Sequence, residues 1–231
     1  MSKPPYRIGI PIIDQVDLLD VCNAIEIFRW MNSFWKERSV EAPLIGKTTD
    51  LVTTGNKVQL KPDACFSDFD DANHLDAIYV PGGSGEYVDI ATKDADLLAF
   101  VTQQAAHAQL VTSVCTGAFI LAQAKLLDGR ECTTHWFFQN QFRAQFPNAR
   151  LVNGYPRYVK ATTAPIVTGG GISSAIDESL YIVSLIAGDE VAQSIQLAIQ
   201  YHPDPPFTDG DPAQADYRTW SRVMRAWGQP A

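Results

Sequence analysis

Short apolar runs typical of buried strands alternate with helix-forming stretches along this chain. Residues 7–13 are apolar and β-branched, and apolar residues then recur at helical spacing from Leu18 to Phe28. The same order returns at 77–80, 94–108 and 110–114, which predicts a strand, a helix and a strand. Because parallel strands need crossover helices between them, the alternation predicts an α/β fold with a mainly parallel sheet and helices on both faces.

The rest of the chain continues this pattern. Further strands are expected at 44–47, 51–53, 58–61, 131–134, 157–160 and 166–168, and further helices at 135–146, from the glycines 169–171 through 186, at 189–200 and around 217–227. No repeat, low-complexity tract or linker divides the 231 residues. We therefore expect a single domain, 1–231, with a core over about 7–207 and a C-terminal tail, 208–231, that can form a helix.

Charge and cysteine content disfavour several classes of protein. The net charge of -8 opposes binding to a phosphate backbone, which needs clustered Lys and Arg. No apolar stretch reaches membrane-spanning length, and the first residues do not resemble a signal peptide. The four cysteines, at 22, 65, 115 and 132, lack the spacing of a disulfide framework or a zinc site. We expect a cytoplasmic protein that acts on a small molecule, without nucleic acid, membrane or metal.

The run 109–117 places one thiol at a strand-to-helix turn. A buried-strand pattern ends at Cys115, and Gly117 and the helix-forming stretch 118–127 follow at once. A nucleophile on such a turn lies near the amide-rich start of the next helix, which stabilises a thiolate. We therefore expect this thiol to titrate below its reference pKa of about 8.5. A structural cysteine is the alternative, since free Cys often behaves as a small buried hydrophobe.

The carboxyl edge of a parallel sheet is where α/β proteins bind ligands. The turn after Ile13, the Pro81-Gly82-Gly83 loop and Cys115 all fall on this edge, which favours a catalytic role for the thiol. The amides of Gly82 and Gly83 can approach a substrate closely and are candidates for binding an anion or oxyanion; a tight turn is the alternative. The run 169–171, three glycines, lacks the spacing of a dinucleotide or phosphate loop and is expected to serve helix packing.

Acidic and histidine side chains complete the candidate site. Asp20 lies on the first turns of a helix that is expected to begin near Asp17, and so faces the same edge as the thiol. Asp17 competes as a capping carboxylate, and Asp14 and Glu26 are further candidates. His135 follows a strand and could line the cleft, either as a second group beside the nucleophile or as a hydrogen-bonded structural residue.

Four segments taken together resemble the DJ-1/PfpI superfamily, and within it the isocyanide hydratases. They are Val-Pro-Gly-Gly at 80–83, Thr-Ser-Val-Cys-Thr-Gly-Ala at 112–118, Thr-Thr-His-Trp at 133–136 and Thr-Gly-Gly-Gly-Ile at 168–172. The resemblance implies a flavodoxin-like sandwich, a homodimer and a nucleophile at Cys115. It places the essential acid on Asp20 and the threonine after the cysteine on Thr116. Relatives carry Gly-Pro a few positions after the acid, where this chain has Asn23-Ala24.

The activity that this resemblance implies is hydration of isocyanides to N-substituted formamides without a metal or organic cofactor. A Cys115 thiolate adds to the isocyanide carbon, Asp20 as a carboxylic acid supplies the proton that gives a thioimidate, and Asp20 then activates water. The Gly83 amide or Thr116 stabilises polar intermediates. A redox-sensing or chaperone-type role of the DJ-1 kind and a non-catalytic small-molecule sensor are the alternatives. A peptidase is disfavoured, because peptidase-type members carry His where Thr116 stands.

Overall fold

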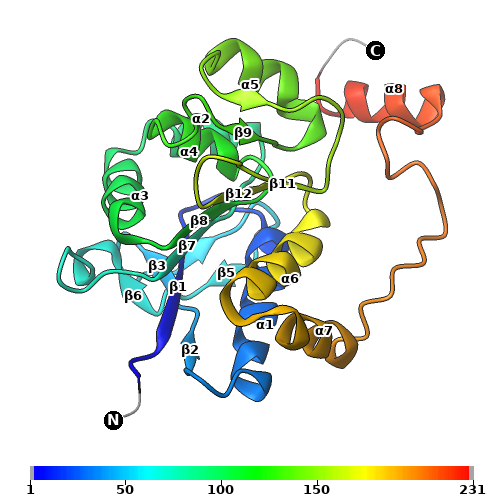
Figure 1. Cartoon of the computed structure of the whole chain (residues 1–231). Helices are drawn as coiled ribbons and strands as arrows, with labels where there is room; N and C mark the ends of the chain where they lie inside the picture. Colours follow the sequence, from blue (N-terminus) through cyan, green and yellow to red (C-terminus); the bar gives the residue numbers. More distant parts are fainter. Residues whose placement is uncertain (1–2, 229–231) are drawn as a thin grey trace.

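An eight-stranded sheet runs through the centre of the computed structural model, which describes residues 3–228 (Figure 1). Its strand order is β11-β12-β8-β7-β1-β3-β6, with β2 paired to β1. The pairings are parallel except that of β11 with β12. The strands are β1 (Tyr6–Pro11), β2 (Val40–Glu41), β3 (Leu44–Gly46), β6 (Ala64–Cys65), β7 (Ala77–Val80), β8 (Leu110–Ser113), β11 (Tyr158–Lys160) and β12 (Ile166–Gly169).

Helices cover both faces of this sheet (Figure 1). One face is packed by α1 (Leu18–Phe34), α6 (Ser174–Ala187) and α7 (Asp189–Ala198), and the other by α2 (Gly85–Ala91), α3 (Ala95–His107) and α4 (Gly117–Gln123). The smaller elements are β4 (Val52–Thr53), β5 (Gln59–Leu60), η1 (Phe66–Asp68), β9 (Glu131–Cys132), η2 (Trp136–Phe138), α5 (Gln139–Gln145), β10 (Arg150–Leu151) and α8 (Tyr217–Ala226). The predicted flavodoxin-like α/β sandwich is confirmed.

Several element boundaries differ from the prediction. The helix expected over 135–146 is divided into the 3-10 turn η2 and α5. The helix expected to open at the glycines 169–171 begins only at Ser174, because those glycines form the end of β12 and a tight turn. Three two-residue strands, β2, β6 and β10, and the short helix α2 were not predicted. Such elements hold too few residues to display an apolar period.

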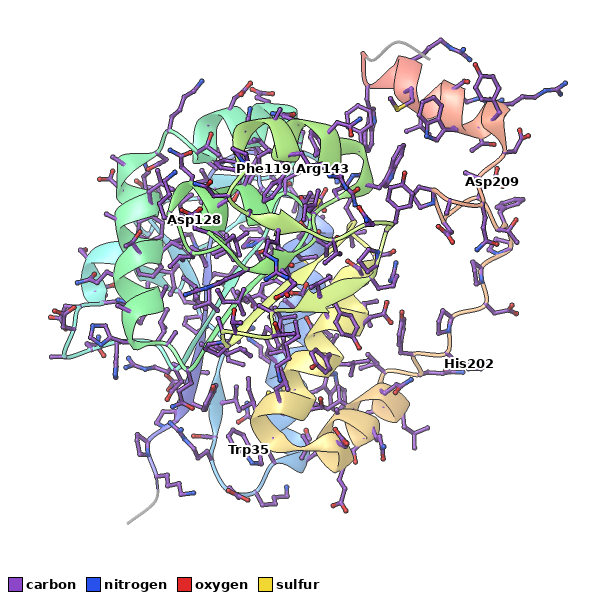
Figure 2. The ribbon with its side chains drawn as sticks, turned by 45° about the horizontal axis from the view of Figure 1, so that its top comes forward. Trp35, Phe119, Asp128, Arg143, His202 and Asp209 are labelled. Atoms are coloured by element: carbon purple, nitrogen blue, oxygen red, sulfur yellow. The ribbon has the colours of Figure 1, made fainter. Side chains whose placement is uncertain are left out.

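The core forms where the apolar faces of the helices meet the sheet. On α1 the buried side chains of Val21, Ala24, Phe28 and Met31 recur every three or four residues, which is the period of one helix face. Phe119 on α4, labelled in Figure 2, packs edge-on against three phenylalanines at 138, 142 and 146. Full burial of such a side chain contributes about 1.5–3 kcal/mol, so this packing fixes α4 and the turn before it.

The segment after α7 leaves the body of the molecule before it returns. Figure 2 shows His202 and Asp209 on this extended stretch, away from the packed helices. It leads to α8, which confirms the predicted terminal helix. Trp227 then packs against Phe137 at a ring-centroid distance of 4.6 Å and against His135 at 5.5 Å. Among the helices at 3–228, none is both long and apolar enough to cross a bilayer.

Candidate active site

Cys115 lies on a sharp turn between β8 and α4, as predicted. Its φ angle is 57°, the left-handed region that residues other than glycine rarely adopt. The turn is held from both sides: the hydroxyl of Thr134 donates to the Cys115 carbonyl oxygen at 2.8 Å, and a side chain at Gly117 would overlap the Val80 carbonyl. Only 3% of Cys115 is exposed. The fold therefore imposes a costly backbone conformation at this thiol, which is typical of active-site residues.

Asp20 is the acid that the structure brings to Cys115. Asp17 caps α1, and its carboxylate accepts from the Leu19 amide at 3.0 Å and the Asp20 amide at 3.4 Å. Asp20 on the first turn is fully buried, and its Oδ2 accepts from the Gly82 amide at 2.9 Å. Helix α1 continues without interruption through Asn23-Ala24. The departure from Gly-Pro at these positions therefore leaves a regular helix behind Asp20.

Burial controls the ionisation of both groups. It raises the pKa of the Asp20 carboxyl well above its usual value, while the Gly82 amide and the Cys115 thiol oppose the rise. Burial and the neighbouring Asp20 raise the pKa of the Cys115 thiol, and the Thr116 amide opposes this. The expectation of a lowered thiol pKa is therefore wrong for this closed geometry, because burial outweighs the amide at the helix start. A buried pair of this kind tolerates one negative charge at a time.

The Gly82-Gly83 loop holds the site together through its amides. The Gly82 amide donates to Asp20, and the Gly83 amide donates to the Thr116 hydroxyl at 2.8 Å, which in turn donates to the Gly83 carbonyl at 2.8 Å. Neither amide is free to bind an oxyanion in this geometry. The predicted anion-binding role of this loop would require one of these hydrogen bonds to break. The structure does show the loop packed closely against the start of α4, where a Cβ at Gly82 would crowd Thr116.

His135 lies beside the site without joining the Cys115–Asp20 pair. Its Nδ1 accepts from the Phe137 amide at 3.3 Å, and burial lowers its pKa from 6.5 to about 4, so the ring is uncharged at neutral pH. Together with Leu19, Trp136 and Gly171 it lines a hollow of about 1540 Å³ between the core and the C-terminal segment. Gly171 permits this packing, since a Cβ there would lie 3.0 Å from the His135 ring.

Sequence reasoning missed one buried acid behind the site. Glu178 on α6 is fully buried, and its carboxyl lies against Gly169 at the end of β12, where any side chain at 169 would overlap it. The signal was present in the sequence: Glu178 falls in the buried stripe that Ala175, Ile182 and Val183 form on α6. Within residues 3–228, no group of three His, Cys, Asp or Glu side chains is placed to hold a metal ion.

Comparison with known proteins identifies the family of this chain. The DJ-1/PfpI family model matches residues 6–184, which include the Gly82-Gly83 loop, Cys115 and Glu178. The chain belongs to the DJ-1/PfpI family. It is 35% identical over 209 residues to an isonitrile hydratase from Pseudomonas putida, a match that covers 90% of this chain and 84% of that protein.

Other proteins that are similar to this chain have different described roles. The chain is 25% identical to the HTH-type transcriptional regulator GbdR from Pseudomonas aeruginosa and spans about half of that longer protein, while the match covers 84% of this chain. Among solved structures, a ThiJ/PfpI family protein from Pseudomonas syringae superimposes with a TM-score of 0.85 at 25% identity, covering 97% of this chain and 87% of that one. An oxidised DJ-1 from Toxoplasma gondii superimposes with a TM-score of 0.71 at 22% identity and shows the shared fold, covering 86% of this chain and 100% of that one.

Proposed function

We propose that this family member hydrates isocyanides to N-substituted formamides. The observation that supports the proposal most is the pairing of Cys115, on its left-handed turn, with the buried acid Asp20. The 35% identity to an isonitrile hydratase over 90% of the chain supports it independently. Cys115 is the nucleophile and Asp20 the proton carrier in this proposal, and the acid and the nucleophile share the single negative charge that the buried site accepts.

The first step forms a carbon–sulfur bond. The Cys115 thiolate adds to the terminal carbon of the isocyanide, and the electron pair left on that carbon takes the proton of the Asp20 carboxylic acid. The product is a thioimidate, in which the former isocyanide carbon carries one hydrogen and the sulfur. The negative charge moves from Cys115 to Asp20, which keeps the hydrogen bond that its Oδ2 accepts from Gly82. The site therefore holds one negative charge before and after the step.

Water completes the cycle through the same carboxylate. Asp20 takes a proton from a water molecule while the water oxygen adds to the thioimidate carbon. Asp20 then passes this proton to the nitrogen. The carbon–sulfur bond then breaks, the hydroxyl proton returns to Asp20, and the thiolate and an N-substituted formamide are released. Thr116 holds the Gly83 loop in place during these steps through its two hydrogen bonds. Neither Cys115 nor Asp20 lines the hollow, but Thr134, whose hydroxyl donates to the Cys115 carbonyl, does. The uncharged ring of His135, with Trp136 and Leu19, gives this hollow an apolar wall that suits an uncharged substrate.

Incubation with an aryl isocyanide, followed by detection of the formamide, tests this function. We expect turnover in the purified protein, loss of turnover in Cys115→Ala, and retention in Cys132→Ala, which removes another buried thiol. Turnover should persist in the presence of a chelator. Loss of activity with chelator and its return with zinc would contradict the mechanism, and absence of formamide from a folded protein would reject the function.

A ligand-sensing module without turnover is the second candidate. The identity to a transcriptional regulator over 84% of this chain favours it. A sensor binds a small molecule and releases it unchanged. Ligand-induced thermal stabilisation without product would favour the sensor, whereas formamide release would favour the enzyme. A homodimer and a cytoplasmic location are further proposals, which light scattering and cell fractionation can test.

A further inference from the structure

A group of buried polar atoms behind Asp20 has no hydrogen-bond partner in the described chain. It comprises Asp20 Oδ1, the Tyr79 hydroxyl and both carboxyl oxygens of Glu178; the Ser179 hydroxyl lies beside Tyr79 and opposes the rise of its pKa. Leaving a buried polar atom unsatisfied is destabilising, so four such atoms in one region are unlike ordinary packing. Native proteins satisfy groups of this kind with internal water molecules. The region is therefore suited to binding water between the acid of the site and Glu178.

Strand register places Tyr79 and Glu178 on the same face of the sheet. Tyr79 pairs with Thr112, and Thr112 with Val167, so these three side chains point the same way. Gly169, two residues after Val167, shares that face, and the Glu178 carboxyl occupies the space where a side chain of Gly169 would lie. The Tyr79 ring packs against Phe28 of α1, the helix that also carries Asp20. Tyr79 thus lies between the helices that supply the two acids.

The environment of Glu178 favours its uncharged form. It is fully buried, and among residues 3–228 it forms no ion pair and receives no amide hydrogen bond. Burial raises the pKa of its carboxyl, and the neighbouring Asp20 raises it further. Asp20 does receive an amide, from Gly82. Of the two acids, Asp20 therefore carries a negative charge more readily, while the protonated form of Glu178 is favoured and can donate a hydrogen bond.

Several titratable groups lie around the site and on the elements packed against α6. They are Asp17 before α1, Asp20 on α1, Tyr79 on β7, Tyr87 on α2, Cys115 after β8, Asp177 on α6 itself, Tyr158 and Lys160 on β11, and Asp189 and Glu190 on α7. Asp177 is paired with Arg157, and the four on β11 and α7 lie at the surface. Strand β12 carries no titratable side chain. Asp20 is accordingly the acid whose charge Glu178 senses most.

We propose that Glu178 is a positioning residue for Asp20. The two carboxyls share internal water molecules with Tyr79 and titrate as a coupled pair, so that a charge on one raises the pKa of the other. When Asp20 carries the charge, the protonated Glu178 carboxyl and the Tyr79 hydroxyl donate hydrogen bonds to water molecules, which in turn donate to Asp20 Oδ1. The contribution of Glu178 to turnover rests on the proposed function, whereas its effect on the Cys115 thiol does not.

Glu178→Gln tests the coupling because it removes the ionisable group and keeps its size. At alkaline pH the wild type gains a second buried charge at Glu178, which raises the pKa of the remaining acids. The variant lacks this charge. The midpoint of the pH dependence of Cys115 alkylation, followed peptide by peptide with mass spectrometry, should move to lower pH by about one unit. The alkaline limb of kcat should move the same way.

Glu190→Gln on the neighbouring helix is the matched control, because it makes the same change at the surface; its alkylation profile should coincide with that of the wild type. A Glu178→Gln profile that also coincides with the wild type overturns the proposal, and it does so even in a protein without isocyanide turnover. A shifted alkylation profile without turnover would retain the coupling and reject the proposed function.

A second measurement is independent of whether Glu178→Gln folds. Coupling between two sites is reciprocal, so removing the charge of Asp20 must shift the pKa of Glu178 by as much as removing the charge of Glu178 shifts the pKa of Asp20. Infrared absorption of protonated carboxyls, compared between the wild type and Asp20→Asn, should show the Glu178 band lost at lower pH in the variant. An unchanged band position and titration would overturn the proposal. A high-resolution crystal structure should show ordered water bound by Asp20 Oδ1 and the Tyr79 hydroxyl, and a dry region there would reject the shared water.

Discussion

Replacing Asp20 with Asn separates proton transfer from the architecture of the site. Asn has the same size, and its side-chain oxygen can still accept from the Gly82 amide, which lies 2.9 Å from Asp20 Oδ2. What disappears is the transferable proton. General acid–base catalysis contributes about 10²–10⁴-fold to rate, so kcat should fall by at least about 10²-fold, equivalent to about 2.7 kcal/mol of transition-state stabilisation.

The same substitution should make the nucleophile easier to ionise. Asp20 is the charged neighbour that raises the pKa of Cys115, second only to burial. An uncharged Asn removes this contribution, so the thiolate should form at lower pH and alkylation of Cys115 at neutral pH should become faster. Turnover and thiol reactivity thus move in opposite directions. General damage to the fold would instead lower both turnover and thiol reactivity. If such damage exposed the thiol and made it more reactive, the melting temperature would fall at the same time.

The assay combines formamide production with peptide-resolved alkylation across a pH series. Asp17→Asn and Glu26→Gln are the matched controls: Asp17 caps α1, and Glu26 accepts from the Trp30 indole at 3.0 Å. Both should retain most turnover. Turnover of Asp20→Asn near the parent rate, together with its loss in either control, would refute the assignment of the acid. Slower alkylation of Cys115 in a folded Asp20→Asn would refute the electrostatic reasoning.

Four further substitutions have defined outcomes. Cys115→Ala should abolish formamide production, while Cys132→Ala should retain most of it; equal loss in both would point to a general packing defect. Thr116→Val removes two hydrogen bonds to Gly83 and should lower the free energy of unfolding in urea by about 1–3 kcal/mol. As the pH falls from 6.5 to about 4, the wild type should lose thermal stability, because the His135 ring takes up a proton in the unfolded chain but not in the folded one. His135→Phe should reduce this loss. An unchanged dependence of melting temperature on pH would show that the ring does not titrate in this range.

The parts of the fold that depend on long periodic segments were predictable from sequence. The apolar runs 7–13, 77–80 and 110–114 gave buried strands, and the period on α1 gave a helix capped at Asp17. The position of Cys115 followed from the same logic, because a strand that ends in a small-residue turn before a helix leaves little freedom for that turn. The strands of two residues escaped prediction, since their pairing depends on neighbours far away in the chain.

The electrostatics of the site were less accessible to sequence reasoning. The helix start behind Cys115 suggested a lowered thiol pKa, but the depth at which the thiol lies was not encoded in its neighbours, and burial reversed the direction. Likewise, the amides of Gly82 and Gly83 looked available, yet tertiary contacts with Asp20 and Thr116 occupy both. Such contacts join residues 62 and 33 positions apart, which local patterns cannot reveal.

The left-handed backbone at Cys115 sets a limit on how this protein can be stabilised by directed evolution. Glycine adopts such angles freely, and a strained non-glycine residue costs of the order of 1–3 kcal/mol. A library selected only for melting temperature would therefore tend to replace the nucleophile with glycine and discard the thiol. Lys57, Lys125 and Gln200 share the conformation, with φ angles of 64°, 62° and 52°. Glycine or asparagine at these three positions offers the same relief of strain while Cys115 is held constant.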